Sequence, residues 1–178
     1  HMTCRGSRRN VKDKAKNIYE DSPEWLEQNA RSTRNFIRKW GHFVTHDEYM
    51  KPIISPKYNI GLIVKNCNDS LIHALEPWAD TLYVDEGNIP TLIKNYIKNE
   101  QVNTIIDLND RIKPYDNEKN CEILIDIDGT TFAQEDYKIL MKLPEIIKDS
   151  GSIGRFALNN LKVEIVQMNE YQKNLIKL

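Results

Sequence analysis

Apolar positions near the start of the chain follow the spacing of one helix face. They recur at alternating intervals of four and three residues at Leu26, Ala30, Thr33, Ile37 and Trp40. Ser22 is a good N-cap, Pro23 suits the first helical position, and Gly41 is a natural stop. The pattern predicts a helix over residues 23–40.

From Lys57 onward, short apolar runs alternate with helical segments, which is typical of strands covered by helices. The runs predict strands at residues 60–65, 81–84, 103–108 and 122–127. Helices are expected between them at residues 69–75 and at about 90–99. The β-α-β-α-β order favours a parallel sheet with right-handed crossovers.

The last third of the chain predicts a long helix followed by a hairpin. The helix covers residues 134–148, with a kink or break at Pro144. Two short apolar runs, 156–158 and 161–166, flank Asn159-Asn160, a reasonable hairpin turn because Asn tolerates positive φ. A short final helix would close the chain.

Together these elements predict an α/β fold. We expect a small Rossmann-like, mainly parallel sheet with a C-terminal β-hairpin, preceded by an N-terminal helical arm. Pro52 and Pro56 bracket an extended stretch that is typical of a linker. The predicted division is therefore an arm over residues 3–50 and an α/β domain over residues 55–178.

Composition narrows the class of partner. Lys and Arg total 25 against 26 Asp and Glu, and this balance argues against a nucleic-acid partner. No apolar run approaches the roughly 20 residues of a spanning helix, so no membrane span is expected. Three widely spaced cysteines without a CxxC pair fit neither a disulfide framework nor a zinc site. They indicate a reducing, cytoplasmic setting.

The segment EILIDIDGTT, residues 122–131, runs a strand into Asp-x-Asp-Gly-Thr. It resembles the nucleophile motif of haloacid-dehalogenase-like phosphatases, which implies Asp126 as nucleophile, Asp128 as general acid/base and magnesium alongside. The chain departs from that family: the motif lies late, and no Asp-Asp pair follows it. The structural alternative is that both aspartates end a strand and Gly129 makes the turn.

The same Asp126-x-Asp128 pair is similar to the metal-nucleotide motif of GT-A glycosyltransferases, where it would hold Mg²⁺ or Mn²⁺. The chain is too short on either side of this pair to hold the two halves of a GT-A fold. We therefore expect no cofactor in this chain. The alternative is a metal ion bound at these two aspartates. Any ligand is expected where the strands end, beside Asp85, Glu86, Asp126 and Asp128.

The histidines offer one further metal candidate. His42, His46 and Asp47 form a cluster that could bind a metal if the segment were helical, because His42 and His46, four residues apart, would share a face. Their position just past a helix stop is equally typical of a polar linker.

The first forty residues resemble the tail of the catalytic domain in inverting, GT-A type glycosyltransferases of family 2. That tail ends in a helix of the form N-x6-F-x-x-K-W-G, which Asn29, Phe36, Lys39, Trp40 and Gly41 fill. The resemblance implies that the nucleotide-sugar site, the metal-binding motif and the catalytic base precede residue 3. Residues 55–178 would then be an appended domain.

We therefore predict a C-terminal, non-catalytic portion of a glycosyltransferase, serving acceptor recruitment, orientation or oligomerisation. Its expected partners are the upstream catalytic domain and a second copy of the chain. One alternative is a metal-dependent, phosphatase-like enzyme that uses Asp126 and Asp128. The other is a stand-alone interaction domain, in which Trp25, Phe36 and Trp40 form an exposed aromatic patch.

Overall fold

The computed structural model describes residues 23–85 and 89–168. Its first part holds a helix and a small two-stranded sheet: α1 (Pro23–Trp40), β1 (Thr45–His46) and β2 (Pro52–Ile53). A second set of elements follows: β3 (Ile60–Lys65), α2 (Asp69–Leu75), η2 (Glu76–Trp78), β4 (Thr81–Val84), α3 (Ile89–Glu100), η3 (Gln101–Asn103), α4 (Leu108–Arg111) and β5 (Ile112–Pro114). The chain continues with β6 (Ile123–Asp128), α5 (Gln134–Met141), α6 (Leu143–Ser150), β7 (Gly154–Leu158) and β8 (Leu161–Ile165).

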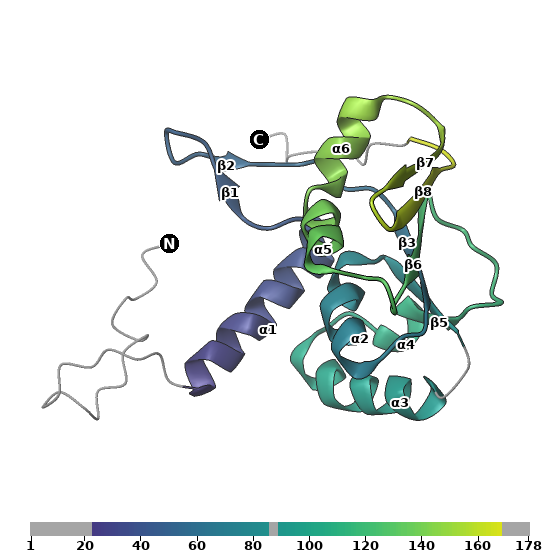
Figure 1. Cartoon of the computed structure of the whole chain (residues 1–178). Coiled ribbons are helices and arrows are strands. Elements are labelled where there is room, and N and C mark those ends of the chain that lie inside the picture. Colours follow the sequence, from purple (N-terminus) through teal and green to yellow (C-terminus); the bar gives the residue numbers. More distant parts are fainter. Residues whose placement is uncertain (1–22, 86–88, 169–178) are drawn as a thin grey trace, which may run out of the picture.

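The main sheet has six strands in the order β5-β4-β3-β6-β8-β7 (Figure 1). Strands β3, β4, β5 and β6 run parallel, and β7 and β8 form an antiparallel hairpin beside β6. This confirms the predicted α/β class with a mainly parallel sheet, a C-terminal hairpin and an N-terminal helix. The first strand, β3, lies in the middle, so the strand order reverses between β3 and β6.

The helices cover one face of the sheet. Leu62 lies beside Leu82 and Ile125 in register, so these side chains share a face, and the buried core on that face includes residues of α1, α2, α3, α5 and α6. The other face carries a smaller cluster without a contribution from any described helix: Ile63, Tyr83 and Cys121, with Tyr115 and Leu124 against them. Figure 1 shows the segment between β5 and β6 running over this side. A loop therefore covers the second face where a doubly wound sheet has helices.

The predicted strand at residues 103–108 is wrong. The side chain of Gln101 donates to the carbonyls of Thr104 and Ile106 and accepts from the amide of Leu108, so it holds this stretch as a loop. Ile105 is fully exposed there. The third parallel strand is the short β5, which begins at Ile112. The two adjacent isoleucines, Ile105 and Ile106, made the sequence of this loop resemble that of a strand.

Pro52 and Ile53, at the start of the predicted linker, pair with β1 in a small hairpin, and the linker itself stays a prediction. The predicted helix break is confirmed: α5 ends at Met141, and α6 begins at Leu143, one residue before Pro144. The turn at Asn159 has φ 52°, as the predicted hairpin requires. The basic N-terminal segment and the predicted final helix lie outside the described residues.

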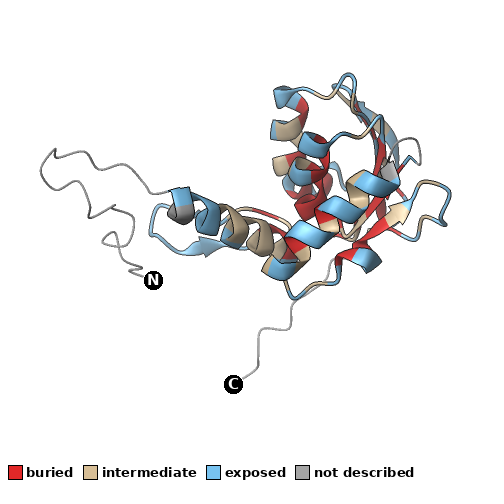
Figure 2. Ribbon diagram, turned by 90° about the horizontal axis from the view of Figure 1, so that it is seen from below, coloured by how far each residue is buried: buried red, intermediate tan, exposed pale blue. Residues whose placement is uncertain are grey.

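Helix α1 projects from the body of the molecule, as Figure 2 shows. Near its C-terminal end Ile37 and Arg38 are buried, whereas Leu26 near the other end is half exposed. Gly41 has φ 76°, which lets the chain turn directly after the helix. No helix in the described ranges is long and apolar enough to cross a membrane. The division at residues 50 and 55 stays a prediction.

Candidate functional site

The point between β3 and β6 is where an open α/β sheet usually binds its ligand, because the strand order reverses there. In this chain the backbone joins the two strand ends at that point. The amide of Gly129 donates to the carbonyl of Lys65 at 2.9 Å. A methyl group on Gly129 would collide with the carbonyl oxygen of Asn66 and lie 2.7 Å from Cδ1 of Leu71. The two strand ends therefore stay in contact just beyond the sheet, and position 129 has no room for a side chain.

Asp128, at the end of β6, fixes this turn. Its Oδ1 accepts hydrogen bonds from the amide of Thr130 at 2.9 Å, the Thr130 hydroxyl at 2.8 Å and Asn66 Nδ2 at 3.0 Å. The bond from the Thr130 amide, followed by that from Asn66, lowers the pKa of the Asp128 carboxyl below its usual value. The carboxylate therefore acts as a cap that joins the ends of β3 and β6.

Asp126 lies on the helix-free face of the sheet. It is exposed, and its register neighbours are Ile63 on β3 and Lys162 on β8. Asp85 is exposed after β4, and Glu86 lies outside the described residues. Within residues 23–85 and 89–168, no group of three or more His, Cys, Asp or Glu is placed to hold a metal ion. A metal at Asp126 and Asp128 stays a prediction.

Cys67 is the described thiol that follows β3. It is half-buried, and burial raises its pKa to about 11. A thiol with that pKa is protonated at neutral pH and is a weak nucleophile. The loop after β3 therefore offers no activated sulfur.

The structure does not bring the histidine candidates onto one helical face. His42 is buried, and its Nδ1 lies 2.6 Å from the carbonyl oxygen of Phe43. His46 is exposed on β1. Asp47 accepts hydrogen bonds from the amides of Tyr49 and Lys51. These residues hold local structure after α1.

The aromatic candidates pack along α1. Phe36 and Trp40 stack with ring centroids 6.2 Å apart, and His42 lies edge-on to Phe36 at 6.1 Å. Lys39 Nζ lies 5.2 Å from the Trp40 ring centroid. Phe36 and Trp40 are both half-buried, and the side chain of Trp25 lies outside what the structure describes. An interaction role for these rings stays a prediction.

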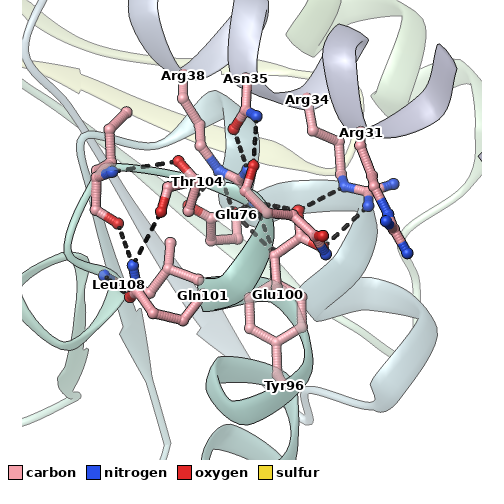
Figure 3. A network of polar contacts seen from close by, with 12 residues as sticks. Arg31, Arg34, Asn35, Arg38, Glu76, Tyr96, Glu100, Gln101, Thr104 and Leu108 are labelled. Atoms are coloured by element: carbon pink, nitrogen blue, oxygen red, sulfur yellow. Dashed lines mark hydrogen bonds and ion pairs between the residues drawn. The ribbon is translucent and has the colours of Figure 1, made fainter. Parts of the chain in front are cut away.

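A buried ionic network joins α1 to the α/β domain (Figure 3). The Arg38 side chain is fully buried, and its guanidinium lies 2.6 Å from Glu76 Oε2 and 2.9 Å from Glu100 Oε1. Tyr96 donates its hydroxyl to Glu76 at 2.8 Å. Burial alone would lower the pKa of Arg38, but Glu76 and then Glu100 raise it above its usual value. Arg38 thus bridges two acids from separate elements, η2 and α3.

Two further arginines complete the network, which we call the arginine clamp and define as Arg34, Arg38, Arg111, Glu76 and Glu100. Arg34 binds Glu100 through two hydrogen bonds of 2.7 and 2.9 Å. Arg111 donates to Glu76 at 2.8 Å and to the carbonyl of Ala79. Each buried acid therefore meets two guanidinium groups, which compensates the cost of burying charge.

Sequence reasoning did not identify the clamp. One local signal was present: Arg34 and Arg38 are four residues apart, so they share a helix face that two cations occupy together. Such a like-charged pair indicates acids on the surface that the helix contacts. Their identity depends on tertiary contacts 38 to 66 residues away.

The comparisons with known proteins found no relative. No protein-family model matches the chain, and neither the curated proteins nor the solved structures contain a match.

Proposed function

We propose that this chain is a C-terminal, non-catalytic module of a glycosyltransferase that holds the preceding catalytic domain in a fixed orientation. The proposal rests on the family 2 resemblance together with one observation, the arginine clamp on α1. The helix that carries the resemblance is anchored by buried ion pairs to the α/β domain. Any domain attached to α1 would therefore inherit a defined position.

Two faces of α1 have different roles in this proposal. Residues 29, 36 and 40 lie within one narrow stripe of an α-helix, because they are seven and four residues apart. Arg34 and Arg38 lie on the opposite side, where they enter the clamp. The residues of the family pattern thus face away from the clamp, where a catalytic domain could contact them.

The carboxyl ends of β3 and β6 support a non-catalytic role. The Gly129 turn joins the ends of β3 and β6, where an open α/β sheet usually binds its ligand, and Asp128 caps this turn. In both features, residues of the DIDGTT segment stabilise the local turn. The segment is therefore better suited to stabilising the fold than to presenting two carboxylates to a substrate.

The purified chain tests the absence of a complete active site. We expect no hydrolysis of a nucleotide sugar or of p-nitrophenyl phosphate above the buffer blank, with Mg²⁺ or Mn²⁺ present. The Asp126→Asn variant should behave identically. Metal-dependent hydrolysis that disappears in Asp126→Asn would contradict the proposal and favour the phosphatase-like alternative.

The orienting role is tested in the longer protein that the proposal requires. Phe36→Asp should lower transfer to acceptor at least tenfold while hydrolysis of the sugar donor stays unchanged. Gln28→Ala, on the exposed part of α1, is the matched control and should leave both rates unchanged. Equal loss of both rates would indicate that α1 belongs to the catalytic machinery itself.

A further inference from the structure

The β1–β2 hairpin ends in a tip, residues 48–50, that is ordered by its own hydrogen bonds. The amide of Asp47 donates to the carbonyl of Lys51 at 2.9 Å, and the amide of Met50 donates to the carbonyl of Asp47 at 3.0 Å. Asp47 Oδ1 accepts from the amides of Tyr49 and Lys51 at 2.9 and 2.8 Å. The tip therefore has a defined shape without support from the core.

Met50 adopts an unfavourable backbone conformation at this tip. Its φ is 62°, in the left-handed region, where glycine usually follows a turn of this kind. A side chain there costs about 1–2 kcal/mol. The side chain is nonetheless 76% exposed, and that of the adjacent Tyr49 is 73% exposed. Strain that exposes an apolar side chain points to a role outside the folded chain.

A pocket of about 330 Å³ lies where the base of the hairpin meets α5 and α6. Its apolar lining includes Phe43, Met141 and Pro144, and two exposed lysines, Lys138 and Lys142, stand at it. Among the other lining residues are His42, Thr45, Ser55 and Glu145. A pocket of this size is at the small end of ligand sites, so it suits a few side chains.

The tip and the pocket complement one another in charge, and both combine apolar with charged side chains. The tip carries exposed Glu48 beside its two apolar side chains, and the pocket combines an apolar lining with two lysines against one glutamate. Lys138 also lies 3.6 Å from Glu135, in an exposed pair that contributes little. Figures 1 and 2 both show the hairpin directed away from α5 and α6, so the tip does not reach the pocket of its own chain.

We propose that the tip of one chain inserts into the pocket of a second copy, and that the exchange is reciprocal. We choose a reciprocal, two-fold arrangement because it closes the assembly at two chains, whereas one-way insertion would leave a free tip and a free pocket and extend the assembly into rings or filaments. Tyr49 and Met50 enter the apolar part, and Glu48 meets Lys138 and Lys142. This inference is independent of the proposed glycosyltransferase role.

Light scattering coupled to size-exclusion chromatography tests the dimer. The chain should elute with twice its mass of 20.8 kDa at high concentration and dissociate on dilution. Met50→Gly should raise the dissociation constant at least tenfold. The same variant should keep or raise the melting temperature, because glycine relieves the strain at φ 62°. Loss of the dimer then cannot be attributed to misfolding.

Charge reversal identifies the contact. Glu48→Lys alone and Lys142→Glu alone should each weaken the dimer, and the double variant should restore at least part of the affinity. A strict monomer at every concentration would overturn the proposal and favour another partner for the tip. A dimer that none of these substitutions affects would equally overturn it and indicate a different surface, such as the rings on α1.

Discussion

At the scale of single residues, Asp136 shows how one buried side chain joins distant segments. Its carboxylate accepts from the amide of Ala133 at 2.8 Å, which caps the start of α5. It also accepts from Asn159 Nδ2 at 2.7 Å and from the amide and side chain of Asn160. Burial would raise the pKa of Asp136, but these hydrogen bonds, led by those of Asn160, lower it.

Replacing this carboxylate should be costly. We expect Asp136→Ala to lower the free energy of unfolding by about 3 kcal/mol, because the start of α5 and the β7–β8 turn lose the buried, charged acceptor that they share. Urea unfolding measures the change. Asp149→Ala, at an exposed position in α6, should stay within about 0.5 kcal/mol of the parent. A loss below about 1 kcal/mol for Asp136→Ala would refute this role.

Gly129 has an equally specific role. Gly129→Ala should destabilise the chain by about 1–3 kcal/mol, since the added methyl group meets the backbone of Asn66 and the side chain of Leu71. Thermal unfolding provides the measurement. Gly151→Asn is the control: nothing lies within 4 Å of a Cβ there, and Asn tolerates its φ of 58°. Similar melting temperatures for both variants would show that the turn joining the ends of β3 and β6 is not tightly packed.

At the scale of elements, local signals predicted much of the fold. The bounds of α1, β3, α2 and β4 match the sequence prediction. Their signals are local: capping and turn residues flank these elements, and the strands are short apolar runs. β5 was missed because it has three residues, and pairing with β4 alone defines it. The β1–β2 hairpin was missed because an exposed methionine occupies the position where a glycine would have indicated a turn.

The candidate site was harder to predict than the fold. The sequence placed Asp126 and Asp128 near the end of a strand, and β6 does end at Asp128. The surroundings of Asp128 depend on Asn66, which lies 62 residues away from it in sequence. The clamp shows the same limit, because Glu76 and Glu100 become partners of Arg38 only when η2 and α3 pack beside α1.

The clamp predicts a large difference between two arginines on α1. Arg38→Met should lower the free energy of unfolding by about 3–5 kcal/mol, because it leaves buried Glu76 and Glu100 each with one cation fewer. Arg31→Met removes only an exposed pair with Glu27 and should cost less than about 1 kcal/mol. Equal losses in denaturant unfolding would show that Arg38 does not anchor the helix.

The clamp also predicts how stability depends on pH. Burial would raise the pKa of Glu100, but Arg34 and Arg38 lower it, so the unfolded chain binds the proton more tightly than the folded one. This contribution is fully present above the unfolded pKa of about 4.3 and is lost as the pH falls through the lower folded value. Urea unfolding between pH 7 and pH 3 should show this loss. Glu100→Gln should show a shallower decline below pH 4.5, and an unchanged slope would contradict the assignment.

At the scale of the whole molecule, the chain combines a rigid connection with two outward-facing surfaces. The arginine clamp fixes α1 to a sheet in which a backbone hydrogen bond joins the ends of β3 and β6. The outer stripe of α1 and the hairpin tip remain for contacts with other chains or domains. The proposed orienting role requires such contacts.

The mass of the native polypeptide tests this account most directly. Intact-mass spectrometry of the protein isolated from its natural source should give a value well above 20.8 kDa, with peptides of a nucleotide-sugar-binding domain preceding residue 3. A native protein of about this chain's own mass, without such peptides, would contradict the proposed role.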